Sequence, residues 1–536
     1  MRYGNKKHNT ALAAFLQMQR VWRILIISLA ISLSFYALSS FSDLELRVPV
    51  LQPYEASTSQ SSAEVGVNRQ FALVIPINTP SPNLCKTIFS ALALGYPSPI
   101  ILNWGQKHQD VSHWRLGRAL PKIPGFVHYL DSVMHPNATD LEKLGEDDLV
   151  LMVDGRDVWF QLPVEVLLSR YHEINKRANE RLRKQWTGRG PMPMRQTIVA
   201  AAEKRCYPND TDLCKVDLRC DIWPESPLRP DLYGPETDKN VSNIHDTRPR
   251  WINGGMYMGP AGDMRRFFRR AMQEMETFID EGFPLRSEQG MMGYLMGKQE
   301  VWRQWQRKNE INSDEFQELV VENFEFGAGL DYAQEISAQT SFTAIDKKQD
   351  IFDAAFISLG NRENIERQSE ARGISPPRIC GLPNDVKTSR NPLARLNNTT
   401  EWEDMPLYTD LAIGTVPAII HHHGSKERRQ TWWDRPWYHQ RLRELATPRL
   451  KPVPIDEPLA TIQVGDDLVS YWAALSEFRD RFPRKANATA NGRFEKMEFR
   501  ELCRWDEKPL PYAKETWWEE VFRDGRGRFN ASWKPV

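Results

Sequence analysis

The segment LVLMVDGRDVWFQLP, residues 149–163, constrains the fold of this chain more than any other. Five apolar residues lead into Asp154, Gly155, Arg156 and Asp157, and a second apolar run follows. One interpretation is a hairpin, because Asp-Gly is a favoured two-residue turn between strands. The other is a ligand site, because carboxylates at the end of a buried strand suit a hard metal ion.

The residues that follow favour the ligand site. Only the stretch 158–162 separates Asp157 from Pro163, which is too short for a second strand of matching length. Residues 164–175 then have the spacing of an amphipathic helix, with a proline near its first turn. The order is therefore strand, polar loop, short apolar link and helix.

Upstream segments predict the sheet to which this strand belongs. Residues 71–76 and 99–104 are apolar, and between them Leu84, Ile88 and Leu92 recur at helical spacing. This pattern is typical of a βαβ unit with parallel strands. The carboxylates at 154 and 157 are then expected at the carboxyl end of a parallel strand, where open α/β sheets bind ligands.

Other polar residues follow later apolar segments. Residues 196–208 read as a strand that enters a cysteine-containing loop, and residues 417–426 end in three histidines and Lys426. Two carboxylates, an imidazole and water suit an octahedral Mn²⁺ or Mg²⁺ ion, and a diphosphate would complete its shell. A histidine triplet is also common in surface loops, so the triplet alone does not distinguish a metal site from a surface loop.

The N-terminus predicts a membrane anchor. Residues 24–41 carry no charge, basic residues without acids precede them, and Asp43 and Glu45 follow. We therefore expect a cytosolic tail at 1–20, a transmembrane signal-anchor at 21–42 and a stem at 43–68, with the body on the far side of the membrane. A cleaved signal peptide is the alternative.

Glycosylation and cysteine patterns fit a secretory compartment. Asn-x-Ser/Thr sequons occur at Asn137, Asn209, Asn240, Asn397, Asn398, Asn487 and Asn530. The six cysteines permit disulfides, and Cys206, Cys214 and Cys220 are close enough for a local bridge, with a zinc site as the alternative. Lys plus Arg equals Asp plus Glu at 70 each, so no charge excess indicates nucleic acid as a partner.

The motifs, in their order, resemble the glycosyltransferase domain of the procollagen lysyl hydroxylases and related uncharacterised fungal type II membrane proteins. The matching segments, over roughly residues 70–430, are DGRDV, AEKRCYP, INGGMYMG, SEQ and HHHGSK. The resemblance implies a GT-A-like (Rossmann-like) α/β fold with a mixed, mostly parallel sheet flanked by helices. We expect this domain at 69–440 and a helical extension at 441–536, with helices at 466–481 and 511–523.

The same resemblance implies roles for individual residues. Asp154, Asp157 and His421 would bind the metal, with His423 as the fallback ligand, and Asp154 would also lie near the donor ribose. Lys426 would contact the diphosphate, and Pro76, Ile77 and Asn78 would lie by the nucleotide base. The donor sugar or the acceptor would meet Asn253, Gly254, Glu288 and Gln289, of which Glu288 is the candidate base. Arg156 departs from the family pattern, as does glycine at 254 or 255 in place of serine.

The implied function is a metal-dependent transfer of a hexose from a nucleotide sugar to a hydroxyl of a protein or glycan. The favoured donor is a UDP-sugar. The enzyme would be a single-pass type II protein of the Golgi or ER membrane. One alternative is a catalytically inactive glycan-binding or scaffold protein with the same fold. A metal-dependent hydrolase is less favoured, because one Asp-x-x-Asp and one histidine do not readily build a two-metal cluster.

Overall fold

Strand β1 (Val67–Pro76) organises the main sheet, because three other strands pair with it. In the computed structural model it runs parallel to β2 (Ile100–Leu102), β3 (Leu149–Val153) and β15 (Asp467–Ala473). The structure describes residues 66–106, 119–208, 217–240, 243–283, 285, 287–308, 322–342, 344–346, 351–450, 457–474, 481–486, 494–505 and 516–529.

The main sheet has ten strands and is mixed. Its order is β17-β16-β2-β1-β3-β6-β5-β7, and β14 joins through β15. Pairs β3–β6, β5–β6, β14–β15 and β16–β17 are antiparallel, and the other five pairs are parallel. The remaining strands are β5 (Ile198–Glu203), β6 (Trp251–Pro260), β7 (Ala328–Asp331), β14 (Ala460–Val464), β16 (Arg484–Ala486) and β17 (Phe494–Lys496). The predicted α/β class with a mixed sheet is confirmed.

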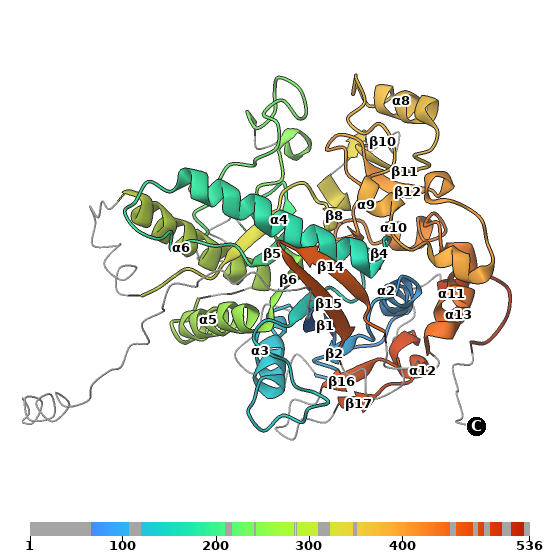
Figure 1. The fold of residues 1–536 in the computed structure, drawn as a ribbon, viewed down its shortest axis with the longest axis horizontal. Coiled ribbons are helices and arrows are strands. Elements are labelled where there is room, and N and C mark those ends of the chain that lie inside the picture. The colour runs from blue at the N-terminus through green and yellow to red at the C-terminus, as the bar shows by residue number, and fades with distance from the viewer. Residues whose placement is uncertain are drawn as a thin grey trace, which may run out of the picture. The chain divides into compact units, whose positions relative to one another are not determined.

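Helices cover both faces of this sheet, as the alternation of side chains along β1 requires. Phe71, Leu73 and Ile75 belong to one buried cluster, which includes α2 and α4. Ala72 and Val74 belong to the other, which includes α3, α5 and α6 (Figure 1). The helix bounds are α2 (Pro82–Ala93), α3 (Lys122–Val133), α4 (Val164–Gln185), α5 (Ala261–Asp280) and α6 (Glu288–Lys308).

The predicted βαβ unit is present. Ser81 caps α2 by accepting a hydrogen bond from the Asn83 backbone N–H, and Pro82 occupies the first turn. Strands β1 and β2 then pair in parallel. The local sequence signals for this unit therefore agree with its tertiary pairing.

The hairpin interpretation of the DGRD segment is wrong. The strand after it, β4 (Val158–Phe160), does not pair with β3 but with β13 (Ile419–His421). Strand β13 also pairs in parallel with β8 (Ser337–Gln339), which completes a three-stranded second sheet. The DGRD segment is thus the link between two sheets.

A region of short elements lies between β8 and β13 along the chain. Two antiparallel pairs occur here, β9 (Ala344–Asp346) with β10 (Ile351–Phe352) and β11 (Ala354–Ile357) with β12 (Leu407–Asp410). Figure 1 shows β10, β11 and β12 together with α8 at its upper right. The short helices of the described chain after residue 360 are α8 (Arg362–Glu370), α9 (Asn384–Lys387), α10 (Arg428–Thr431), α11 (Leu442–Ala446), α12 (Phe499–Cys503) and α13 (Trp517–Phe522).

The helix expected at 466–481 is wrong, because Asp467–Ala473 is strand β15. Val469 and Tyr471 are buried whereas Leu468 is exposed, which is the two-residue period of a strand. Gly465, with φ +60°, forms the turn from β14, so the Gly-Asp pair at 465–466 was the available hairpin signal. Helix α13 lies within the second expected stretch, and the predicted domain boundaries stay predictions.

Two covalent or ionic links hold the C-terminal residues against α2. A disulfide joins Cys85 to Cys503 across 418 residues. Close by, the buried ammonium of Lys86 forms an ion pair with Glu520 of α13 and donates to the Arg429 backbone carbonyl at 2.7 Å. Breaking a buried ion pair leaves an uncompensated charge, so these contacts tie α12 and α13 firmly to α2.

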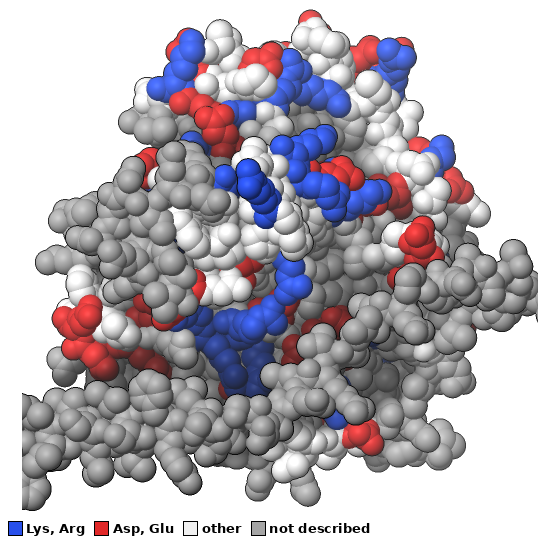
Figure 2. Space-filling view, turned by 60° about the vertical axis from the view of Figure 1, so that its left-hand side comes forward, with Lys and Arg blue, Asp and Glu red and all other residues white. Residues whose placement is uncertain are grey.

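Charged side chains of both signs share the surface. Figure 2 shows Lys and Arg side chains gathered near the centre of one face, with Asp and Glu side chains beside them. Exposed pairs such as Arg229–Asp231, at 2.7 Å, each contribute about 0–1 kcal/mol. Stability therefore rests on the two buried clusters rather than on surface pairs.

Several expectations concern residues outside the described ranges. The tail at 1–20, the anchor at 21–42 and all but the last residues of the stem are among them, as are Cys214 and the sequons at 209, 487 and 530. Within the described part of the chain, no helix combines the length and apolarity needed to cross a membrane. Asn137, Asn240 and Asn397 are exposed.

Replacing Cys503 by serine should lower the free energy of unfolding by about 2–5 kcal/mol, because the Cys85–Cys503 disulfide closes a very long loop. Urea unfolding followed by tryptophan fluorescence measures the change. Cys380→Ser is the matched control, since Cys380 is an exposed free thiol. Equal losses in both variants would contradict a stabilising role for this disulfide.

Candidate metal centre and its surroundings

The two aspartates of the DGRD segment lie at the ends of two different backbone ladders. The Asp154 N–H donates to the Gly255 carbonyl at 3.1 Å, which continues the pairing of β3 with β6. The Asp157 carbonyl accepts from the His422 N–H at 2.6 Å, which continues the pairing of β4 with β13. Both carboxylates are therefore held where the two sheets meet.

His421, the last residue of β13, brings an imidazole to these carboxylates. Its Nε2 lies 3.8 Å from Asp154 Oδ2 and 3.6 Å from Asp157 Oδ1. One ligand atom from each of the three residues lies within 4.8 Å of the others. The three predicted metal ligands thus converge, although His421 follows Asp154 by more than 260 residues.

The orientation of His421 fits a metal ligand. Its Nδ1 lies 2.6 Å from Gln339 Oε1, an atom that can only accept, so Nδ1 carries the hydrogen. Nε2 then faces the two carboxylates and, although it is buried, makes no hydrogen bond within the described part of the chain. A divalent cation would satisfy all three groups, and an imidazole with two carboxylates is a donor set suited to Mn²⁺.

Burial and neighbouring charges shift the pKa values of all three candidate ligands. Burial acts to raise the pKa of Asp157, but His421 and Arg429 outweigh it and hold that pKa at about 2. Burial raises the pKa of Asp154 despite the nearby Lys122. Burial lowers the pKa of His421, but the two carboxylates more than reverse this. The two carboxylates therefore favour the protonated, positively charged form of the imidazole.

Lys122 is a site residue that the sequence did not reveal. Its ammonium forms ion pairs with Asp154 and, at 2.6 Å, with Glu288 Oε1. It is the first residue of α3. This helix lies close to the end of β2, where a Cβ on Gly125 would come within 1.9 Å of Asn103 Oδ1. No local pattern distinguishes this lysine from a surface lysine, since only the approach of α3 to the strand ends brings it inward.

Close packing leaves no room for a side chain at two glycines of β6. A Cβ on Gly255 would lie 2.2 Å from His421 Cε1, so a side chain there would displace the imidazole. A Cβ on Gly254 would lie 2.9 Å from Glu288 Oε1. The backbone of β6 therefore passes directly against the metal ligand and the start of α6.

Glu203, at the end of β5, connects the remaining predicted site residues. Its Oε2 accepts from Asn253 Nδ2 at 2.8 Å and its Oε1 from Gln289 Nε2 at 2.9 Å. Gln289 Oε1 in turn accepts from the Gly254 N–H, and Asn253 Oδ1 from the Gly255 N–H. These contacts fix the part of β6 that lies against His421. The sequence motif that contains Glu203 does not itself indicate this role.

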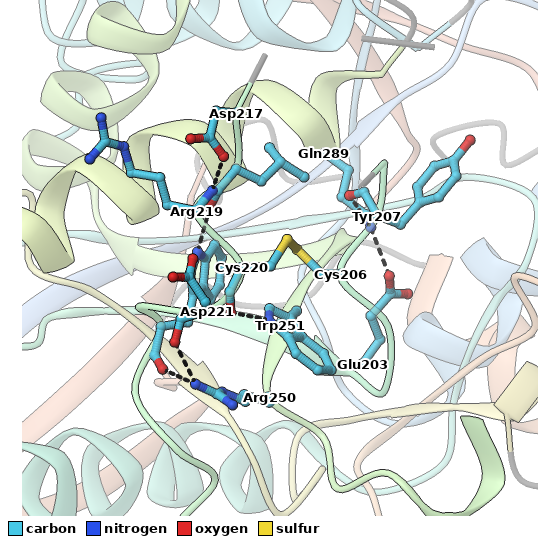
Figure 3. The surroundings of a disulfide bond; sticks show 12 residues. Glu203, Cys206, Tyr207, Asp217, Arg219, Cys220, Asp221, Arg250, Trp251 and Gln289 are labelled. Atoms are coloured by element: carbon cyan, nitrogen blue, oxygen red, sulfur yellow. Dashed lines mark hydrogen bonds between the residues drawn. A yellow bond between two sulfur atoms is a disulfide. The ribbon is translucent and has the colours of Figure 1, made fainter. Parts of the chain in front are cut away.

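A disulfide supports this network from the side of the following loop. Figure 3 shows the Cys206–Cys220 bridge near the Glu203–Gln289 pair and Trp251. Gln289 Nε2 also donates to the Tyr207 carbonyl at 3.3 Å, and Trp251 Nε1 to the Cys220 carbonyl at 3.1 Å. The predicted local bridge is thus present between the first and third cysteines of the cluster.

Burial raises the pKa of Glu203 to about 7, although the amide donors Asn253 and Gln289 act to lower it. His423 Nε2 lies 3.7 Å from Glu203 Oε2 and 2.5 Å from Ser341 Oγ. His423, the fallback ligand, therefore contacts Glu203 and Ser341, and His421 is the histidine in the ligand cluster.

The residues predicted to lie by the nucleotide base are the last residue of β1 and the two that follow it. They border the DGRD segment. A Cβ on Gly155 would lie 3.0 Å from Ile77 Cδ1, and Pro76 ends β1 next to it. Asn78 Nδ2 donates to the Gln106 carbonyl at 3.1 Å. Arg156 turns to this same loop, where its Nη2 donates to the Thr79 hydroxyl.

Lys426 lies on the exposed turn between β13 and α10. The turn packs closely because a Cβ on Gly424 would lie 2.3 Å from Ser341 Cβ. The structure thus brings Asp154, Asp157, His421, Asn253, Gly254, Glu288 and Gln289 into one connected site, with Pro76, Ile77 and Asn78 beside it. The predicted diphosphate contact of Lys426 stays a prediction.

No protein-family model matches this chain. No curated protein matches it either. Among solved structures, it is similar to the galactosyltransferase LgtC in complex with donor and acceptor sugar analogues. The similarity covers 72% of this chain and 97% of LgtC, at 12% identity and a TM-score of 0.29. A likeness this weak carries no argument, so the interpretation of the site rests on its residues.

Replacing Gly255 by alanine should weaken Mn²⁺ binding by about 10–100-fold, because the new methyl group displaces His421 from the ligand cluster. Calorimetric titration of the apo chain with Mn²⁺ measures the Kd. Gly381→Ala is the control, since its Cβ would meet no atom closer than 4.0 Å. An unchanged Kd in Gly255→Ala would argue against His421 as a ligand.

Glu203 should make the stability of the metal-free chain depend on pH. Its pKa is raised from 4.5 to about 7 on folding, so between these values the folded chain binds a proton that the unfolded chain does not. The free energy of unfolding therefore falls as the pH rises through this window, by roughly 3 kcal/mol. Glu203→Gln should remove this part of the slope.

Urea unfolding in EDTA at about pH 5 and about pH 7.5 compares the two proteins across this window. Glu180→Gln controls for the loss of an exposed carboxylate. Identical pH dependence in the wild type and Glu203→Gln would show that the folded and unfolded chains bind protons equally at this residue.

Proposed function

We propose that this chain is a metal-dependent glycosyltransferase that moves a hexose from a nucleotide sugar to a hydroxyl of a protein or glycan. The observation that carries the proposal is the convergence of Asp154, Asp157 and His421 at the junction of two sheets. Asp154 follows the carboxyl end of β3, a strand that is parallel to β1, where α/β sheets bind nucleotides. UDP is the first nucleotide to test.

A divalent cation held by these three residues would neutralise the diphosphate of the leaving nucleotide. Lys122 adds a positive charge at the same place, between Asp154 and Glu288. Lys426, on its exposed turn, is free to reach a phosphate in solution. The loop after β1 would take the base, with Arg156 bonded to Thr79 and so holding that loop in place.

The acceptor side of the proposed site is formed by the network around Glu203. Transfer with inversion requires a base for the acceptor hydroxyl. Glu288 is bonded to the Lys122 ammonium, which would have to move before Glu288 took a proton. Glu203, with a pKa of about 7, is poised to exchange a proton near neutral pH, and Asn253 and Gln289 would orient it.

We also propose that the chain is anchored through residues 21–42 in the Golgi or ER membrane, with its body in the lumen. The disulfides Cys85–Cys503 and Cys206–Cys220 support this, because such bonds persist in oxidising compartments. The exposed sequons at Asn137, Asn240 and Asn397 are accessible for glycosylation.

The full-length chain should hydrolyse one nucleotide sugar slowly in the absence of acceptor, in a reaction that requires Mn²⁺ and is abolished by EDTA. A panel of UDP- and GDP-sugars, with release of the nucleotide as the readout, identifies the donor. Asp157→Asn should lower turnover by at least about 100-fold, since it removes a charged ligand beside the leaving group.

Asp140→Asn is the matched control, because Asp140 is exposed and lies outside the site. Turnover that is equal in both variants would exclude the proposed role of Asp157. If no donor turns over and Mn²⁺ promotes the binding of no nucleotide, the catalytically inactive glycan-binding protein becomes the better description.

A further inference from the structure

A pocket of about 440 Å³ lies among the short elements that precede and follow β13. Four aromatic residues, Phe352, Phe356, Tyr408 and Trp432, form its walls together with Arg372 and Arg435. The volume falls within the ~300–1,000 Å³ that is usual for small-molecule sites. None of these residues belongs to the metal centre.

The aromatic walls are fixed by secondary structure and by one another. Phe356 and Tyr408 are directly paired across β11 and β12, with ring centroids 5.3 Å apart. Trp432, at the end of α10, contacts Phe352 edge-on at 5.4 Å. The rings are therefore held in place before any ligand arrives, which lowers the entropic cost of binding.

The charged groups of the pocket are both positive. Arg372 is held by hydrogen bonds from Nε to the Phe352 carbonyl, at 2.6 Å, and from Nη1 to the Gln368 carbonyl, at 2.7 Å. The exposed Arg435 lies over the Trp432 ring at 4.9 Å. No residue that lines the pocket is acidic. The guanidinium groups suit a carboxylate, sulfate or phosphate.

The nearby carboxylate of Asp353 does not cancel this charge. It lies in the bend between β10 and β11. There it is 3.6 Å from Lys204 Nζ and 3.0 Å from His245 Nε2. Asp353 also acts on Arg372 through its charge, but it shares that charge with these two groups, and the residues that line the pocket include two arginines and no acid.

We propose that this pocket binds an acidic sugar unit of the acceptor glycan, namely a pyranose that carries a carboxylate, sulfate or phosphate. The apolar face of the sugar would stack on the aromatic walls while its anionic group meets Arg372 and Arg435. This assignment to an acceptor rests on the proposed glycosyl transfer. The nucleotide already has a place beside Asp154, so the second site falls to the other substrate.

The pocket adjoins the metal centre through two contacts. The Trp432 ring lies 6.0 Å from the ring of His422, which follows the ligand His421. Arg428 of α10 donates to the Thr340 carbonyl at 2.6 Å, and Thr340 follows Gln339, the residue that orients His421.

Binding to the full-length chain in EDTA, without any nucleotide sugar, tests this directly. The probes are methyl β-D-glucuronide, glucose 6-sulfate and glucose 6-phosphate, with methyl β-D-glucoside as the neutral comparison, and calorimetry gives each Kd. At least one acidic sugar should bind saturably and at least about tenfold more tightly than the neutral sugar. Which of the three binds distinguishes the anionic group.

Arg435→Gln should weaken that binding by at least about tenfold, and Phe356→Ala should weaken both acidic and neutral sugars. Arg435 is exposed, so its replacement leaves the fold intact, and a thermal melt verifies this. Arg362→Gln is the matched control, because Arg362 is an exposed arginine of α8 outside the pocket.

The proposal is overturned if no acidic sugar binds, or if Arg435→Gln and Arg362→Gln behave alike. It is also overturned if UMP displaces the acidic sugar in a way that depends on Arg435, since the pocket would then be a nucleotide site. Turnover of a nucleotide sugar is not a readout here. Failure of this test and failure of the glycosyltransferase proposal can therefore be told apart.

Discussion

The four-residue link between β3 and β4 is the constraint on which the rest of the site depends. It leaves one sheet at Asp154 and enters another at Asp157, and each aspartate is held by the backbone ladder of its own sheet. His421 reaches both because β13 lies next to β4. A change in the relative position of the two sheets would separate the carboxylates from the imidazole, so the packing between the sheets is part of the site.

Residues that end strands could be predicted from the sequence, and residues placed by packing could not. Asp154, Asp157 and His421 follow recognisable apolar runs, and the parallel arrangement of β1, β2 and β3 follows from the βαβ pattern. Lys122 and Gln339 carry no such signal. Their roles arise from the approach of α3 and from the pairing of β8 with β13, contacts that no local pattern encodes.

The same distinction explains why the segment expected to be a helix at 466–481 contains strand β15. Leu468, Val469 and Tyr471 have a composition that suits either a helix or a strand, and neighbouring chain decides between them. Here the partner is β1, whose residues 67–71 pair with β15. Tertiary pairing therefore overrides the local pattern, and β14 to β17 join the main sheet, whereas α11, α12 and α13 are helical.

The pairing of β1 with β15 also has a consequence for the order of synthesis. β1 is among the first parts of the body to leave the ribosome, but one of its partners is translated about 400 residues later. Until then part of this strand presents unpaired backbone groups to its surroundings. The part of β1 that pairs with β15 therefore lacks this partner during most of translation, and a chain truncated before residue 467 would leave that part of β1 without it.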